Sequence, residues 1–165
     1  MSIETRTIKA GSMEFETDVC GDGKKLALCL HGFPESKYSW RYQLPFLAEK
    51  GYTVWAPNLR GYGKSSRPLG KKNYRITALI EDLVAITEAA KAEGLEPSIL
   101  LAHDWGGAIA WSGLLTDAVH FDRFIPMNMP HPAIFRKRIW TSRQFLRSWY
   151  ILFFQLPWVP ERRLT

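Results

Sequence analysis

The sequence has 165 residues, of which 46% are hydrophobic and 23% are charged, as in a globular protein long enough for one domain with a sizeable core. Its apolar runs are too short to span a bilayer, and its first residues lack the apolar stretch of a secretory signal peptide. Two cysteines do not make a disulfide framework, and Cys29 lies in an apolar run that predicts a small core residue. We therefore expect a cytoplasmic protein without a membrane span.

The formal charge of +6 lies at one end of the chain. Residues 1–133 contain 15 basic and 15 acidic residues, whereas residues 134–165 contain 7 basic residues and one acid, Glu161. Aromatic residues alternate with the basic ones there, as on nucleic-acid or membrane surfaces and on amphipathic helices with a solvated basic face. Because nothing else in the sequence indicates RNA or lipid, we favour the amphipathic helix and expect no nucleic-acid partner.

Strands and helices are predicted to alternate along the chain, which favours an α/β protein with a mostly parallel sheet. An antiparallel hairpin begins the chain at a sheet edge, and an almost wholly apolar strand buried on both faces follows it. Pro45 leaves the start or straightness of the next helix in doubt. The predicted strands cover residues 5–10, 14–19, 26–30, 52–56, 123–128 and a stretch from 98, and the predicted helices cover residues 38–50, 77–93 and a stretch that ends near 119.

The loop after the fourth predicted strand carries Gly63-Lys64-Ser65, which ends like a phosphate-binding P-loop. That pattern needs a glycine at position 58, where Asn58 stands. We therefore predict no phosphate site in this loop, and we expect neither a metal nor a cofactor elsewhere in the chain.

The most informative stretch covers residues 98–111, which begin as an apolar strand, pass through Asp104 and continue with helical spacing. Ala102 and Gly106, two residues before and after Asp104, are small enough to let the strand and the helix approach closely. Asp104 would then lie at the exposed end of a parallel strand beside the positive end of a helix, as in the nucleophile elbow of esterases but with Asp in place of Ser. An aspartate that merely caps the helix is the alternative.

Four motifs stand in the order and spacing of a known family: HGFPE at residues 31–35, RGYGKS at 60–65, HDWGG at 103–107 and NMPHP at 128–132. Together they resemble the α/β-hydrolase fold and, within it, the soluble epoxide hydrolases, over about residues 11–160. The resemblance implies that residues 1–132 form the N-terminal part of the hydrolase core and that residues 133–165 begin a helical cap.

The same resemblance implies that Asp104 is the nucleophile that attacks a small-molecule epoxide. It also implies an oxyanion hole made by the backbone N–H groups of Phe33 and Trp105, and a cis peptide between Phe33 and Pro34. Tyr150 matches one of the two cap tyrosines that activate the epoxide. The residues that the resemblance places at the substrate are His31, Pro34, His103 and Trp105.

A carboxylate nucleophile suits an epoxide. A serine that attacked an epoxide carbon would form an ether, whereas a carboxylate forms an ester that water can cleave at its carbonyl carbon. The carboxylate needs no base for this attack, but the alkoxide that leaves needs a proton donor such as a tyrosine. Negative charge on the ester carbonyl during hydrolysis would be stabilised by the oxyanion hole.

The family's water-activating histidine, its acid and the second cap tyrosine find no match in the sequence. His103 adjoins Asp104 but is expected to point to the other face of the sheet, and His31 and His131 match positions that shape nearby loops. We therefore predict the N-terminal portion of an epoxide hydrolase, impaired in turnover when alone, whose partner is a C-terminal half or a second copy in a homodimer.

Three other functions stay open. A haloalkane dehalogenase uses the same aspartate chemistry, but the dehalogenases that resemble this chain often place Asn at the position of Phe33, and a fluoroacetate-type enzyme would place Arg where Trp105 stands. A non-catalytic binding protein could keep the hydrolase core without its base. A nucleic-acid module formed by the basic and aromatic residues 134–165 is the third.

Overall fold

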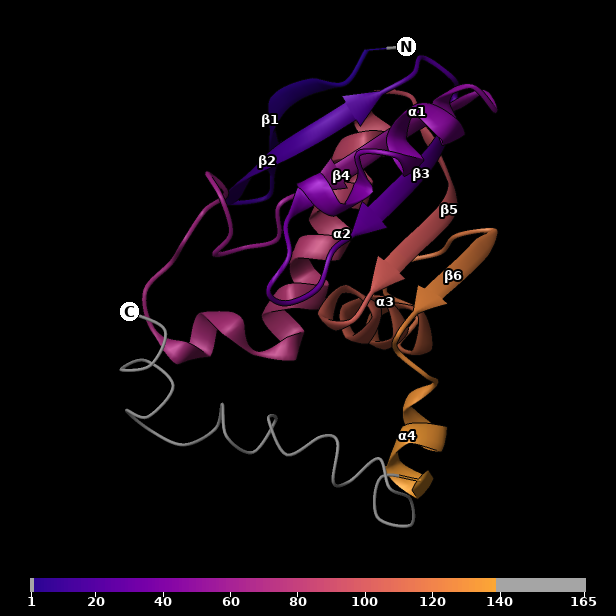
Figure 1. The fold of residues 1–165 in the computed structure, drawn as a ribbon. Helices are drawn as coiled ribbons and strands as arrows, with labels where there is room; N and C mark the ends of the chain where they lie inside the picture. Colours follow the sequence, from indigo (N-terminus) through magenta and orange to yellow (C-terminus); the bar gives the residue numbers. More distant parts are fainter. Residues whose placement is uncertain (1, 139–165) are drawn as a thin grey trace. The chain divides into compact units, whose positions relative to one another are not determined.

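The computed structural model describes residues 2–138, and the chain divides into two compact units, Met1–Met129 and Pro130–Thr165. The first unit contains a six-stranded sheet with helices on both faces (Figure 1). Of the second unit, the structure describes helix α4 (Pro132–Arg138) and the residues just before it. No helix among residues 2–138 is long and apolar enough to cross a membrane.

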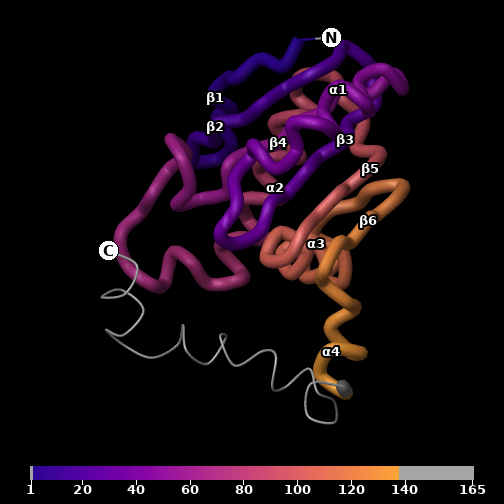
Figure 2. The backbone as a smooth tube through the Cα atoms, viewed as in Figure 1, coloured from indigo at the N-terminus to yellow at the C-terminus, as the bar shows by residue number. Residues whose placement is uncertain are grey.

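The strands of the sheet are β1 (Glu4–Ala10), β2 (Met13–Cys20), β3 (Lys25–Leu30), β4 (Tyr52–Pro57), β5 (Glu96–His103) and β6 (Arg123–Met127). Their spatial order is β1-β2-β4-β3-β5-β6, which can be followed along the tube in Figure 2. β1 pairs antiparallel with β2, and β2 with β4, whereas the remaining pairs are parallel. The predicted hairpin at a sheet edge is confirmed.

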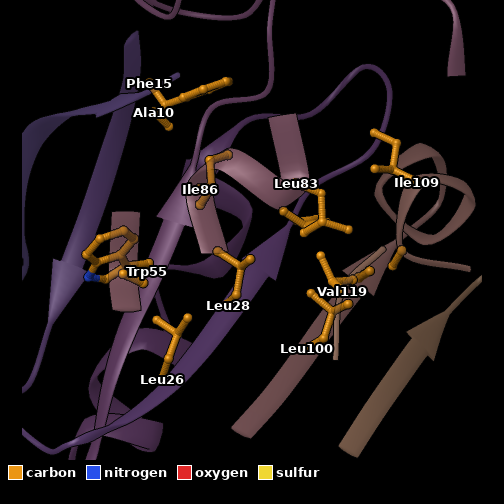
Figure 3. Close-up of a cluster of buried hydrophobic side chains, with 14 of the residues drawn as sticks. Ala10, Phe15, Leu26, Leu28, Trp55, Leu83, Ile86, Leu100, Ile109 and Val119 are labelled. Atoms are coloured by element: carbon orange, nitrogen blue, oxygen red, sulfur yellow. The ribbon is translucent and has the colours of Figure 1, made fainter. Parts of the chain in front are cut away.

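Helices cover opposite faces of β3 and its neighbours. Helices α2 (Ile76–Ala92) and α3 (Trp105–Leu115) pack on one face, where Leu26 and Leu28 join the larger core (Figure 3). Helix α1 (Gln43–Ala48) packs on the other face, against Ala27 and Cys29. Because successive strand residues point to opposite faces, a strand covered on both sides must be apolar throughout, as predicted for this one.

The cysteines contribute to this packing and not to a covalent framework. Both are free and buried. Burial raises the pKa of the Cys29 thiol, which therefore stays protonated and unreactive. The prediction that Cys29 is a core residue is confirmed.

Two helices differ from their predicted bounds. The stretch expected as one helix over residues 38–50 forms a short 3-10 helix, η1 (Lys37–Trp40), and then α1. Pro45 stands in the first turn of α1, where its missing N–H has no partner to lose, whereas it would break a continuous helix. The helix expected to reach residue 119 ends at Leu115 because Asp117 adopts a φ of 54° and the N–H of Ala118 donates to Gly113 O at 2.9 Å.

The loop after β4 is held against α2 by a buried ion pair. Arg60 and Asp82 are each 6% exposed, and Nε and Nη2 of Arg60 donate to the two carboxylate oxygens at 2.6 and 2.5 Å. The guanidinium also donates to the backbone oxygens of Asn73 and Ala78 at 2.6 and 3.1 Å. The hydrogen bond to Asp82 raises the pKa of the Arg60 guanidinium, whereas burial raises the pKa of the Asp82 carboxyl against the opposing effect of Arg60.

Asp82→Asn should lower the free energy of unfolding by about 3–5 kcal/mol, because it leaves a buried guanidinium without its counter-charge. Urea denaturation followed by circular dichroism measures this change. Glu88→Gln is the matched control on the same helix, since Glu88 is exposed and pairs with Lys91 at 2.8 Å; it should cost less than about 1 kcal/mol. Equal losses in the two variants would show that the buried pair does not hold the loop.

Candidate active site

Asp104 occupies the sharp turn from β5 into α3 with an unusual backbone conformation. Its φ of 48° and ψ of −116° lie where residues other than glycine are strained by about 1–3 kcal/mol. Its N–H donates to Met127 O at 3.0 Å and its carbonyl accepts from the N–H of Ala108 at 3.1 Å, so both strand and helix hold the turn in place. The predicted elbow is present in the backbone.

Glycines allow the surrounding segments to approach this turn. A Cβ atom on Gly106 would lie 2.5 Å from Leu30 O, and one on Gly32 would lie 2.5 Å from the Cβ of Asp104. A side chain on Gly107 would meet Met129 at 2.6 Å. The tight packing predicted from Gly106 is therefore observed, and Gly32 and Gly107 share the same constraint, which the sequence analysis did not assign to them.

The carboxylate of Asp104 does not cap the helix that follows it. Asp104 makes no side-chain capping bond to α3. Instead, Oδ1 accepts a hydrogen bond from the backbone N–H of Phe33 at 3.0 Å. The peptide between Phe33 and Pro34 is cis, as the resemblance implied. The structure thus decides against the helix-cap alternative and brings together Asp104 and one of the two predicted oxyanion-hole donors.

Trp105 supplies the second predicted donor position. It is the first residue of α3, and the first N–H groups of a helix have no acceptor within the helix. Trp105 is 57% exposed and Phe33 is 43% exposed, so two large apolar residues next to Asp104 in sequence or by hydrogen bond are open to solvent. Pro34, beside Phe33, is exposed as well.

The ring of His103 joins the ends of three strands. Its Nε2 lies 2.9 Å from Nδ2 of Asn128, which follows β6, and must therefore accept from that amide. Its Nδ1 lies 3.2 Å from Oε2 of Glu35, which follows β3. Glu35 and Asn128 were part of the recognised motifs without an assigned role, because only the tertiary structure brings them to the histidine.

His31 is completely buried and uses both ring nitrogens. Nε2 accepts from the N–H of Leu59 at 3.0 Å, so Nδ1 carries the proton and donates to Gly32 O at 2.9 Å. The rings of His31 and Tyr62 form a T-shaped pair with their centroids 4.7 Å apart. In this position His31 reaches no substrate and instead joins the loops that follow β3 and β4, a correction to its predicted place at the substrate.

The environment keeps His31 and Tyr62 neutral. Burial lowers the pKa of His31. Burial, and then the negative charge of Asp104, raise the pKa of Tyr62. Tyr62 therefore lies near the Asp104 carboxylate, a neighbour that the sequence did not indicate.

Other predicted residues lie elsewhere. Tyr150 falls outside the described residues. His131 belongs to the second unit, where its Nδ1 accepts from the N–H of Ala133 at 3.2 Å at the start of α4. Among residues 2–138 there is no group of three His, Cys, Asp or Glu side chains that could hold a metal ion.

With this geometry in view, comparison with known proteins decides the family. Residues 27–157 match the family model described as alpha/beta hydrolase fold. The chain belongs to the alpha/beta hydrolase family. The fold class predicted from the four motifs is confirmed by this match.

Two of the similar proteins are named epoxide hydrolases. The chain is 42% identical over 157 residues to epoxide hydrolase 4 of Homo sapiens, covering 93% of this chain and 42% of the relative. It is 43% identical over 141 residues to epoxide hydrolase 1 of Caenorhabditis elegans, covering 85% of this chain and 34% of the relative. The chain thus spans less than half the length of these relatives.

A solved structure shows the same arrangement in three dimensions. The crystal structure of an epoxide hydrolase from Vigna radiata superposes with a TM-score of 0.79 at 32% identity. The match covers 97% of this chain and 52% of that one.

The strain at Asp104 can be measured by comparing two variants that both remove the carboxylate. The free energy of unfolding should be about 1–2 kcal/mol higher for Asp104→Gly than for Asp104→Ala, because glycine adopts a positive φ without strain. Chemical denaturation of the two purified variants measures the difference. At Asp122, whose φ is not positive, the alanine variant should be more stable than the glycine variant. A more stable alanine variant at both positions would contradict strain at Asp104.

Burial of neutral His31 predicts a pH dependence of stability. When the pH falls below 6.5, the ordinary pKa of histidine, His31 becomes protonated in the unfolded chain but stays neutral in the folded chain. The free energy of unfolding therefore decreases by up to about 1.4 kcal/mol per pH unit below that value. His31→Gln should flatten this slope between about pH 6.5 and 5 in urea titrations. His120→Gln, at an exposed histidine, should retain the slope.

Proposed function

We propose that this chain carries the nucleophilic half of an epoxide hydrolase site. Asp104 attacks an epoxide carbon and forms a hydroxyalkyl ester, which water later cleaves to a vicinal diol. The observation that carries the proposal is the carboxylate of Asp104, which lies at a strained elbow and accepts from the N–H of Phe33 at 3.0 Å. The names of the similar proteins support the choice of an epoxide as the substrate.

The contact to Phe33 assigns different tasks to the two carboxylate oxygens. Oδ1 is held by the Phe33 N–H, so Oδ2 is the atom that forms the new bond to carbon. As the C–O bond of the epoxide breaks, its electron pair moves to the epoxide oxygen, which takes a proton from a tyrosine; Tyr150 is our candidate.

Ester hydrolysis then depends on the same backbone groups. When water adds to the ester carbon, negative charge develops on Oδ1, where Phe33 N–H already points and where the Trp105 N–H would join it. Loss of one such donor typically lowers the rate by about 100- to 1,000-fold.

The exposed residues around the carboxylate suit an epoxide with an apolar substituent. Phe33, whose N–H contacts the Asp104 carboxylate, and Trp105, which follows Asp104, are both exposed, as is Pro34 next to Phe33. We propose that these three contact the substituent and that His103 orients the loop ends that carry them. Burial of this apolar surface by the substituent would supply binding free energy.

Water activation calls for groups beyond those described. His31 is buried, and His103 is engaged by Asn128 and Glu35, so we do not assign the base to either ring. We propose that the histidine, its acid and the second tyrosine belong to the part of such an enzyme that its longer relatives have, supplied either by the same polypeptide or by a partner. We therefore expect residues 1–165 to form the ester faster than they cleave it.

Intact-protein mass spectrometry after incubation with styrene oxide tests the proposal. The unmodified chain should gain the mass of one epoxide, and peptide mapping should locate it on Asp104. Asp104→Asn should show no gain. Asp117→Asn is the matched control, because Asp117 is an exposed aspartate that also has a positive φ of 54°. This variant should gain the mass of one epoxide, as the chain without substitutions does.

Two results would contradict the proposal. One is an adduct that persists in Asp104→Asn, and the other is a folded protein that forms no adduct with styrene oxide or a second, aliphatic epoxide. An alkyl adduct on Asp104 from 1-bromohexane without any epoxide adduct would indicate a haloalkane dehalogenase instead.

A further inference from the structure

The loop between β4 and α2 has a charge unlike the rest of the first unit. From Arg60 to Arg75 the chain contains six Lys or Arg residues and no Asp or Glu. The remainder of residues 1–133 contains nine basic and fifteen acidic residues. Positive charge is therefore concentrated in one short segment, and the rest of residues 1–133 is acidic on balance.

Five of these six cations face solvent. Arg60 is buried in its ion pair with Asp82, but the other five residues are exposed. None of the five forms an ion pair with a carboxylate within residues 2–138. They are Lys64, Arg67, Lys71, Lys72 and Arg75, and we refer to residues 64–76 as the cationic loop.

Apolar side chains project from the same loop. Leu69, between Arg67 and Lys71, is 91% exposed, which is the highest value among the large hydrophobic residues exposed in the described part of the chain. Ile76 is 40% exposed and Tyr74 is 39% exposed. Contact of an exposed leucine with water is unfavourable in free energy, whereas its transfer into an apolar phase is favourable. A negatively charged surface with an apolar phase behind it would attract the cations and accept the leucine.

Hydrogen bonds fix the loop in this exposed conformation. Asn73 Nδ2 donates to Leu69 O at 2.6 Å, and the N–H of Asn73 donates to Gly70 O at 3.1 Å. The backbone oxygen of Asn73 in turn accepts from Arg60 at 2.6 Å. The buried ion pair thus supports the loop from beneath, and Leu69 is presented outward by an ordered turn.

We propose that the cationic loop binds the surface of an anionic phospholipid bilayer, with the cations at the headgroups and Leu69 inserted at the level of the acyl chains. Each basic residue near such a surface is worth about a fivefold change in partitioning at physiological salt. Phosphates of a nucleic acid would also attract the cations, but they offer no apolar phase for Leu69, so the exposed leucine favours lipid.

The cationic loop lies at the edge of the sheet where Asp104 also lies, so membrane binding would affect access to the candidate active site. β4, β3 and β5 run parallel, so the loop after β4 and Asp104 after β5 emerge at the same edge of the sheet. A bilayer bound to the cationic loop would therefore lie on the side from which Asp104 is reached. This consequence rests on the proposed function, whereas the lipid binding itself does not.

Co-sedimentation of the full chain with lipid vesicles tests the proposal without any activity assay. The chain should bind phosphatidylcholine vesicles that contain about 30% phosphatidylserine, should bind pure phosphatidylcholine at least about tenfold more weakly, and should be released by about 0.5 M salt. Lys71→Glu/Lys72→Glu should weaken binding to the anionic vesicles by at least about tenfold.

The matched control is Lys24→Glu/Lys25→Glu, an equally exposed lysine pair at the opposite edge of the sheet, where β3 begins. It makes the same change in net charge and should weaken binding less than about threefold. A comparable loss in both double variants would show that total charge, and not the cationic loop, determines binding.

Insertion of Leu69 is tested with Leu69→Cys labelled with an environment-sensitive dye, since the two native cysteines are buried. The dye emission should shift to the blue with anionic vesicles and stay unchanged with phosphatidylcholine alone. The proposal is overturned if the chain binds neither vesicle, if Lys71→Glu/Lys72→Glu binds as well as the unmodified chain, or if that variant loses binding only to duplex DNA.

Discussion

The close approach of three segments at Asp104 is the constraint on which the candidate site depends. The end of β3, the end of β5 and the first turn of α3 meet where Gly32 and Gly106 leave no room for a side chain. That approach places the N–H of Phe33 within 3.0 Å of the carboxylate, and it forces Asp104 into a conformation that an L-residue adopts at a cost. The strain and the hydrogen bond therefore have one origin, because both follow from packing the strand and the helix so tightly around one residue.

Polar side chains hold the loops that surround this elbow. His31 joins the loops after β3 and β4, His103 joins residues that follow β3 and β6, and Arg60 fixes the loop after β4 to α2. His31 and Arg60 are buried, and their hydrogen bonds to Leu59 and Asp82 join residues more than twenty positions apart, because a buried polar group requires a partner. The same Arg60 also supports the conformation in which Leu69 stands exposed.

Sequence patterns predicted helices and strands well where their formation depends on residues that are close in sequence. The apolar run of β3, the hairpin around Gly11 and the strand–Asp–helix stretch at Asp104 all follow from spacing of two or three and a half residues and from small side chains. The prediction was less accurate at helix ends. Pro45 divided one expected helix, and Asp117 ended another early through a positive φ that its side-chain type only permits and does not require.

The sequence by itself determined the fold family, because four short motifs carry it in local order. From the same motifs it predicted Asp104 as the nucleophile and Phe33 and Trp105 as the oxyanion-hole donors. Only the tertiary structure decided which groups meet: that the Asp104 carboxylate faces Phe33 and does not cap its helix, that Glu35 and Asn128 reach His103, that His31 is fully buried, and that Tyr62 lies near Asp104. These contacts join residues separated by tens of positions. Their existence depends on the order of strands in the sheet and on where helices cover it, and neither is encoded in the spacing of neighbouring side chains.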